Sequence, residues 1–313
     1  MKIRSFFTGL FPRSKELRKA IRSYQKKEIN KEDLNRVYSS EAKKLIELQK
    51  EIGVAYYQEG MLKWQDLLRP LCNYSGIQEG TLIRWFETNF FYRMPVVKDK
   101  IRYEEPVLRE FYCLDALKEV NKIMIPIPDP LTFAILSENY YYLRIKDLIE
   151  DISQAIIEDI ANIKLDISAF QVISPAIGYY EINEEDLKLY NDFLKKLRNF
   201  NKKIIVHFSF IRYLYFLSKI QGFDVLSLDL CYGDREKIIK AIPSCNALSL
   251  GLIDVSTSLI EEPSYLLKEI TRVSNYRNLG ELYITNSSDL DLLPYEKAVE
   301  KIKVIKEVLN DEA

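Results

Sequence analysis

The chain has 313 residues, of which 47% are hydrophobic, enough to bury the core of one barrel-sized domain or of two smaller domains. It carries 45 Lys and Arg residues against 46 Asp and Glu residues, so there is no bulk positive charge with which to bind nucleic acid or an anionic membrane. No apolar stretch reaches the length of about 18 residues needed to cross a bilayer, which argues against a membrane protein.

Cysteine usage and the N-terminus indicate a reducing compartment. The cysteines are scattered without a C-x-x-C spacing, at Cys72, Cys113, Cys231 and Cys245, which argues against a disulfide framework and a thiol-rich metal cluster. Pro12 and Arg13 interrupt the first apolar run before the core of a signal peptide could form. We therefore expect a cytoplasmic protein. Abundant Ile, Lys, Glu and Tyr with few Cys, Met and His is typical of thermophile proteins.

Strand and helix signals alternate along the chain. Short apolar runs predict eight strands, at 3–8, 54–57, 123–127, 169–173, 203–207, 224–228, 247–250 and 281–284. Capped or periodic segments predict helices, at 14–27, 30–52, 107–120, 143–163, 184–200, 210–220, 234–241, 262–275 and 294–310. Eight such units favour a closed (β/α)₈ TIM barrel, with residues 1–313 as a single domain. An open doubly wound sheet is the main alternative, but the chain has no Gly-rich phosphate-binding turn.

A long excursion between the second and third strands, at about residues 60–106, has few clear periods. It contains both tryptophans, Trp64 and Trp85, which could line a cleft or a partner surface. Excursions between barrel strands usually carry substrate-facing loops.

The only histidine, His207, ends the β-branched run 203–207, which predicts a buried strand of a parallel sheet. Side chains at that end of a barrel strand point into the active-site mouth. A lone histidine can be a zinc ligand or a packed core imidazole, and zinc usually needs three or four N, S or O ligands. The other strand ends therefore decide between the two interpretations.

Several blocks of sequence, in the same order over nearly the whole chain, resemble the cobalamin-independent methionine synthases. They are Phe11–Ala20, Leu48–Gly53, Glu59-Gly60 with Asp66, Pro128–Phe133, Gln171–Ala176, Leu252–Val255 and Leu293–Ala298. The resemblance implies a barrel in which a zinc ion, held by one His, two Cys and a Glu, activates homocysteine as a thiolate. The thiolate then takes a methyl group from a reduced pterin or another donor.

Compared with that family pattern, most of the zinc ligands are missing. His207 is retained, but Ser209 and Ser288 stand at the two cysteine positions, and Asp229 stands at the glutamate. Because an un-ionised serine is a weak ligand, we expect a degenerate metal site without zinc and without catalytic residues. Cys231, two residues beyond Asp229, could substitute in part.

The positions of the family's substrate site have changed as well. Apolar residues stand at three polar positions, and a serine replaces the histidine proposed as proton donor: Leu10, Met61, Ile173 and Ser256. Losing the carboxylates removes the partners of a homocysteine ammonium, and a buried ammonium without partners is costly. The apolar replacements suggest that the mouth is partly filled.

Four basic residues gather at the first helix: Arg13, Lys15, Arg18 and Lys19. One interpretation is a solvated basic face. The resemblance implies another, because the zinc-free N-terminal barrel of the full-length enzymes uses its comparable helix to grip the acidic tail of a pterin donor.

These patterns favour a zinc-less, non-catalytic member of the family. Full-length enzymes consist of two similar barrels, and a separate chain of one-barrel length fits a split version of that arrangement. Its partner would be a zinc-bearing methionine synthase homologue in methionine biosynthesis. This chain would dock on that partner and help to bind or position the methyl donor. Two alternatives stay open: an active methyltransferase with an altered metal site built from His207, Asp229 and Cys231, and a ligand-binding barrel unrelated to methionine.

Overall fold

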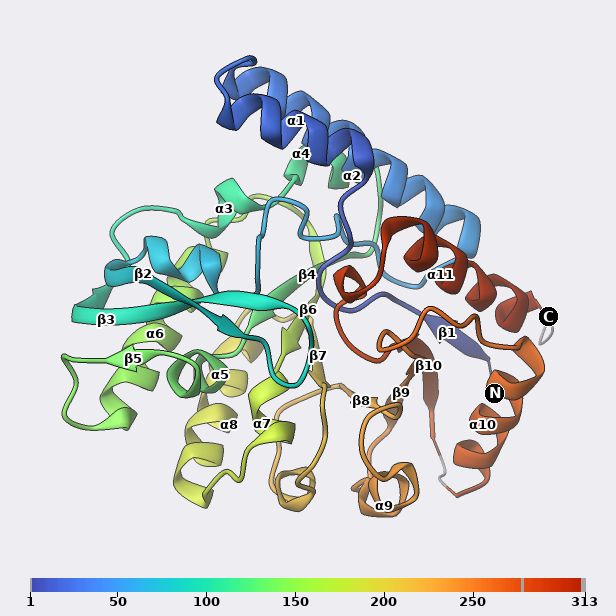
Figure 1. The fold of residues 1–313 in the computed structure, drawn as a ribbon. Helices are drawn as coiled ribbons and strands as arrows, with labels where there is room; N and C mark the ends of the chain where they lie inside the picture. The colour runs from blue at the N-terminus through green and yellow to red at the C-terminus, as the bar shows by residue number, and fades with distance from the viewer. Residues whose placement is uncertain (1, 277–278, 311–313) are drawn as a thin grey trace.

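The computed structural model describes residues 2–276 and 279–310. Seven parallel strands form one curved sheet in the order β1-β10-β9-β8-β7-β6-β4 (Figure 1). The strands are β1 (Ile3–Ser5), β4 (Ile123–Pro128), β6 (Ile167–Ile173), β7 (Lys203–Phe208), β8 (Val225–Asp229), β9 (Ala247–Ile253) and β10 (Glu281–Asn286). Most of their residues are apolar and buried, as expected for strands that are covered on both faces.

The segment 54–57, predicted as the second strand, closes the ring between β1 and β4. The amide of Ala55 donates to the carbonyl of Ser5 at 2.7 Å, and the amide of Tyr57 donates to that of Lys122 at 3.0 Å. Its pairing with β4 is a single parallel bridge from Tyr57 to Ile123, because the segment bonds to each neighbour over too few residues to form a ladder. The predicted (β/α)₈ barrel is confirmed, with its second strand reduced to this bridge.

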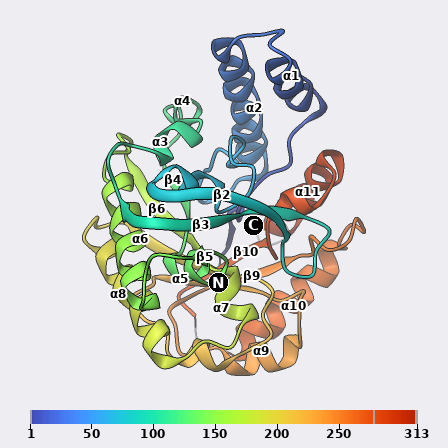
Figure 2. The same cartoon turned by 60° about the vertical axis from the view of Figure 1, so that its left-hand side comes forward.

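Helices surround the barrel, and one pair projects from it. The pair is α1 (Lys15–Gln25) and α2 (Lys31–Ile52), which extends away from the barrel body (Figure 2). The longer outer helices are α6 (Ile145–Ile160), α8 (Glu184–Arg198), α10 (Pro263–Tyr276) and α11 (Tyr295–Asn310). The shorter ones are α3 (Leu108–Phe111), α4 (Leu114–Leu117), α5 (Pro130–Ile135), α7 (Pro175–Tyr179) and α9 (Arg235–Ala241), with 3₁₀ turns η1 (Arg69–Asn73), η2 (Tyr215–Ser218) and η3 (Leu290–Leu292). No helix in the described part of the chain is long and apolar enough to cross a membrane.

Two of the predicted helices differ from the structure. The predicted helix 107–120 is broken into α3 and α4, because the amide of Cys113 between them donates to the buried carboxyl of Glu59 at 3.3 Å. The predicted helix 210–220 is wrong except for the turn η2. There Phe210 has a φ of 55°, outside the helical region, and the amides of Arg212 and Tyr213 donate to the carbonyl of Gly178 on α7, at 2.8 and 3.1 Å.

The excursion at 60–106 contains a β-hairpin that the sequence analysis missed. Strand β2 (Ser75–Arg84) pairs antiparallel with β3 (Phe91–Arg102), and the short β5 (Glu138–Asn139) extends along β3. The hairpin lies across one end of the barrel, and the turn between its strands comes down near the ends of β7 and β8 (Figure 1).

The barrel interior is layered. A separate apolar cluster fills its lower part, formed by Phe6, Met124, Ala169, Ile205, Val225, Ala247 and Tyr283. The next inward positions along the strands are polar and buried, at Thr8, Gln171, His207, Ser227, Ser249 and Thr285. The polar layer therefore lies just below the carboxyl ends of the strands. Barrel proteins carry their active sites at those ends.

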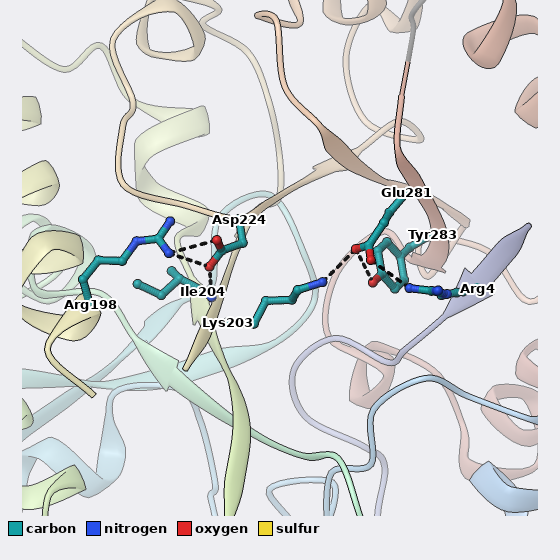
Figure 3. A network of polar contacts seen from close by, with 7 residues as sticks. All are labelled: Arg4, Arg198, Lys203, Ile204, Asp224, Glu281 and Tyr283. Carbon is teal, nitrogen blue, oxygen red and sulfur yellow. Dashed lines mark hydrogen bonds and ion pairs between the residues drawn. The ribbon is translucent and has the colours of Figure 1, made fainter. Parts of the chain in front are cut away.

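At the opposite end of the barrel, Glu281 joins three elements (Figure 3). Its carboxylate accepts hydrogen bonds from Arg4 of β1 at 2.9 Å and from Lys203 of β7 at 2.7 Å. The hydroxyl of Tyr283 donates to the same carboxylate at 2.8 Å. These charges lower the pKa of Glu281, with the hydrogen bond from Lys203 as the largest cause.

Candidate functional site

His207 lies at the mouth end of β7 and is completely buried. Its Nδ1 is 2.8 Å from the hydroxyl of Ser227, and its Nε2 is 3.0 Å from the hydroxyl of Ser209 and 3.1 Å from the carbonyl of Ser287. Because a carbonyl only accepts, Nε2 carries the proton and Nδ1 accepts from Ser227. Burial lowers the pKa of His207 to about 4, so the ring is neutral at pH 7.

Asp229 ends the next strand, β8, and its carboxyl is used to fix two loops. One oxygen accepts from the amide of Phe210 at 3.0 Å, and the other from the amides of Cys231 and Tyr232 at 2.8 and 3.1 Å. Burial raises the pKa of Asp229 to about 7, against the opposing effect of the backbone donors. Burial also raises the pKa of the Cys231 thiol, which therefore stays protonated.

The four predicted metal-site positions lie at the mouth ends of β7, β8 and β10. Ser209 contacts the ring of His207, whereas the backbone carbonyl of Ser288 accepts from the side chain of Asn286 at 2.6 Å. The described residues include no group of three or more His, Cys, Asp or Glu side chains placed to hold a metal ion. Both nitrogens of His207 already have partners, so this donor set does not fit a tetrahedral zinc ion.

Three of the four predicted substrate positions belong to the core. Leu10, Met61 and Ile173 are buried, at 3%, 0% and 2% exposure. The backbone amide of Met61 donates to Glu59 at 2.7 Å, and Met61 has a φ of 50°, which fixes its side chain inside. Ser256 differs, because it is exposed and donates from its amide and its hydroxyl to one oxygen of Asp254, at 2.8 and 2.7 Å.

The structure separates the basic residues of the first helix. Arg13 is half-buried, and its guanidinium donates to the carbonyls of Leu62, at 2.9 Å, and of Trp64, so it fixes the start of the excursion. The other three extend into solvent on α1: Lys15, which pairs with Glu296 at 3.4 Å, and Arg18 and Lys19.

A cavity of about 260 Å³ remains open at the barrel mouth. It lies between the hairpin turn and the loops that follow β7, β8, β9 and β10. Its lining residues are Glu87, Thr88, Asn89, Phe90, Phe210, Asp229, Cys231, Tyr232, Asp254, Val255, Ser256, Ser287, Ser288 and Leu292. Of the eight predicted metal and substrate positions, Asp229, Ser256 and Ser288 line this cavity.

The hairpin turn is attached to the mouth by charge and by ring packing. One carboxylate oxygen of Glu87 accepts from Arg212 and the other from the hydroxyl of Tyr232, both at 2.6 Å. The neighbouring Phe86 places its ring 4.9 Å from those of Phe210 and Tyr179, measured between centroids. The turn therefore covers one side of the cavity.

Sequence reasoning missed the residues that the hairpin and the loops bring to the cavity. Phe210 follows the end of a predicted strand by three residues and Tyr232 by four, so their nearness to strand ends was the available signal. Glu87 and Phe90 gave no signal, because the hairpin that carries them was not predicted.

The fold and the position of this cavity define a (β/α)₈ barrel protein whose functional end is the carboxyl-terminal mouth of the strands. Residues 75–276 match the model of the family described as cobalamin-independent synthase, N-terminal domain. The chain belongs to this family, as its sequence blocks predicted.

Curated relatives are similar in sequence over most of the chain, and solved structures share its fold. The chain is 26% identical over 318 residues to a methionine synthase of Sulfurisphaera tokodaii, covering 97% of this chain and 92% of the relative. It is 24% identical over 302 residues to that of Sulfolobus acidocaldarius, covering 94% and 87%. The fold is similar to that of a B12-independent methionine synthase from Shewanella sp. W3-18-1 solved with selenomethionine, with a TM-score of 0.80, 13% identity and coverage of 100% and 98%. A putative vitamin-B12-independent methionine synthase from Listeria monocytogenes gives a TM-score of 0.76 at 17% identity, with coverage of 100% and 99%.

Proposed function

We propose that this chain is a zinc-less methionine synthase-like barrel that acts as a non-catalytic subunit of a zinc-bearing homocysteine S-methyltransferase. The observation that carries the proposal is the surroundings of His207. Both ring nitrogens are bound by hydroxyls or a carbonyl, and their hydrogen-bond partners among the described residues include no thiol or carboxyl. A neutral imidazole held in this way is a packing and hydrogen-bonding residue, and it leaves no ligand set to activate a thiol.

The proposed partner is a zinc-bearing methionine synthase homologue of similar size in the same cytoplasm. The relatives named methionine synthase are covered over 92% and 87% of their own length, so they too have the size of one barrel. In the proposed heteromer this chain binds or positions the methyl donor, a reduced pterin or another carrier. The exposed Lys15, Arg18 and Lys19 support contact with an acidic donor tail, whereas Arg13 is engaged by backbone carbonyls.

Co-purification from the native cell tests the proposal. The untagged protein is followed by size-exclusion chromatography, its companions are identified by mass spectrometry, and the zinc content of each chain is measured. We expect a zinc-bearing methionine synthase barrel to elute with this chain in a fixed ratio, with zinc only in the partner.

Three results would contradict the proposal. Stoichiometric zinc in this chain would favour an active methyltransferase with an altered metal site at His207, Asp229 and Cys231. Methylation of homocysteine by the isolated chain would also favour that enzyme. Unimpaired growth of a deletion strain without methionine would favour a ligand-binding barrel unrelated to methionine.

A further inference from the structure

The cavity at the barrel mouth has aromatic walls that come from three different segments. Phe90 belongs to the hairpin turn, and Phe210 and Tyr232 belong to the loops after β7 and β8. The rings of Phe210 and Tyr232 meet edge to face, with centroids 5.7 Å apart, so their orientation is fixed by packing. The faces of aromatic rings carry partial negative charge and attract cations.

The charged side chains that line the cavity are all acidic. Glu87 is paired with Arg212, which leaves Asp229 and Asp254 as carboxyls without a basic partner in the lining. Among the described residues that line the cavity, none is Lys or Arg. Arg212 donates to the hydroxyl of Tyr232 at 3.0 Å, and Asp229 accepts three backbone amides. Asp254 is therefore the lining carboxyl that is left to meet a cation from a ligand.

The size and polarity of the cavity restrict the kind of cation. Its volume of about 260 Å³ lies just below the range of about 300–1,000 Å³ found for pockets of drug-sized ligands, so the ligand is small. A metal ion lacks ligands, since the described residues hold no group of three metal-binding side chains. A strongly hydrated primary ammonium would lose its water beside the apolar Val255 and Leu292. A methylated ammonium or sulfonium spreads its charge over methyl groups that pack well against rings.

We propose that this cavity binds a small onium cation, a methylated ammonium or sulfonium group held against the rings of Phe210 and Tyr232 with Asp254 as counter-charge. The inference rests on the proposed function, in which this barrel binds a methyl donor, because onium groups are one chemical class of methyl donor. The hairpin turn contributes Phe90 to the same cavity.

Calorimetric titration of the full-length purified chain tests the charge requirement. The probes are choline and 3,3-dimethylbutan-1-ol, which has nearly the same shape with carbon in place of the charged nitrogen. We expect choline to bind at least about tenfold more tightly than the neutral alcohol. Tetramethylammonium and trimethylsulfonium, titrated in the same way, tell which onium atom the cavity prefers.

Two variants with matched controls locate the binding site. Tyr232→Leu removes one ring and Asp254→Asn removes one charge at constant shape, and each is expected to weaken choline binding by about tenfold. The controls are Tyr24→Leu on α1 and Asp192→Asn on α8, both of which are exposed and outside the cavity. Circular dichroism and thermal melting verify that all four variants are folded.

Equal binding of choline and the neutral alcohol, or no binding of any onium probe, would overturn the inference. So would choline binding that survives both cavity variants, because the ligand would then lie elsewhere. A fixed-ratio complex with the zinc-bearing homologue in the absence of onium binding overturns this inference and leaves the proposed function intact. Onium binding by a chain that forms no such complex supports the inference and removes the subunit role.

Discussion

Lys301 of α11 and Glu261 in the loop after β9 form a buried ion pair, with Nζ 2.7 Å from Oε1. The side chain of Lys301 is fully buried and that of Glu261 is 9% exposed. The same oxygen of Glu261 accepts the amide hydrogen of Asp254 at 2.8 Å, and Lys301 also donates to the carbonyl of Leu259. The pair therefore connects an outer helix to the loop that brings Asp254 to the cavity.

Replacing Lys301 by Met should lower the free energy of unfolding by about 3–5 kcal/mol, because it leaves the charge of Glu261 buried without a partner. Denaturant unfolding followed by circular dichroism measures the change. The double variant Lys301→Met with Glu261→Gln should recover part of the loss, since the uncompensated charge is gone. A single variant as stable as the parent chain would disprove this account of the pair.

Gly9 is expected to tolerate no side chain. Its φ is +69°, and a Cβ atom at Gly9 would lie 1.9 Å from Oδ1 of the buried Asp289, which accepts the amide hydrogen of Leu10 at 3.0 Å. Gly53 is a matched control, because its φ is +83° and a Cβ there would meet nothing within 4 Å. Gly53→Ala should cost about 1–2 kcal/mol from the backbone conformation alone. Gly9→Ala should cost about 1–3 kcal/mol more, from overpacking. Equal losses in the two variants would contradict the predicted clash.

The stability of the protein should fall as the pH rises from about 4 towards 7. Burial raises the pKa of Asp229 and of Glu59 to about 7, and that of Asp129 to about 6. A folded state with raised carboxyl pKa values binds more protons than the unfolded chain. Its extra stability is therefore complete below the unfolded pKa and is lost as the pH passes the folded one. His207 acts in the opposite direction, because its lowered pKa makes protonation favour the unfolded chain below about pH 6.5.

Chemical denaturation between pH 5 and pH 8 tests this dependence. Because several buried carboxyls, with Asp289 and Asp291 among them, oppose one imidazole, the unfolding free energy should be higher at pH 5. Each unit of pKa shift corresponds to about 1.4 kcal/mol. Asp229→Asn should reduce the slope, whereas Asp192→Asn on the surface should leave it unchanged. A stability that rises steadily from pH 5 to pH 8 would refute the prediction.

Loss of the carboxylate of Glu87 should free the hairpin turn without unfolding the barrel. Glu87→Gln weakens the contacts with Arg212 and Tyr232, both of which lie at the protein surface. Hydrogen exchange measured by mass spectrometry should become faster in residues 85–90, with an unchanged thermal midpoint. Glu184→Gln is the matched control, since Glu184 likewise accepts from a tyrosine, Tyr215, and a cation, Lys219, on another face. Unchanged exchange in the turn would show that ring packing alone holds it.

His207→Ala should leave methionine formation by the proposed complex intact, because the residue holds no metal in the proposed role. The variant should lose about 1–3 kcal/mol of stability, since the serines around it lose their partner. The assay combines each variant with the zinc-bearing homologue and measures homocysteine methylation. Replacing the zinc-ligand histidine of that homologue is the control and should abolish activity. Complete loss of methylation with a folded His207→Ala chain would argue for a catalytic role.

The barrel could be predicted because most of its strands are short, mostly apolar segments of the sequence. Residues 204–206 are apolar on both faces, and the structure places them in β7. The hairpin could not be found in this way, since most of β2 is exposed and Pro95 interrupts the pattern of β3. The predicted helix at 210–220 has helical spacing, but Phe210 has a φ of 55° and the amides of Arg212 and Tyr213 donate to the carbonyl of Gly178, so tertiary contacts compete with the helix. Such competition comes from tertiary structure and leaves no trace in local sequence.

Part of the site could be predicted for the same reason. His207, Ser209 and Asp229 follow strands that were recognised, so their place at the mouth could be inferred. The role of Ser227 could not, because it depends on the register of two strands, in which Ser227 lies directly beside His207. The contribution of Glu87 could not be predicted either, because Glu87 lies in the turn between β2 and β3. These strands pair with each other and with the short β5, in a sheet separate from the barrel.

Glu281 connects strands that are not neighbours, since β8 and β9 lie between β7 and β10 in the sheet. The bond from Lys203 to Glu281 therefore crosses the inside of the barrel, as Figure 3 shows. It joins two walls of the barrel that the sheet connects only through β8 and β9. The desolvation penalty of ion pairs falls on heating, so this cross-link persists at temperatures where apolar packing gains no further strength.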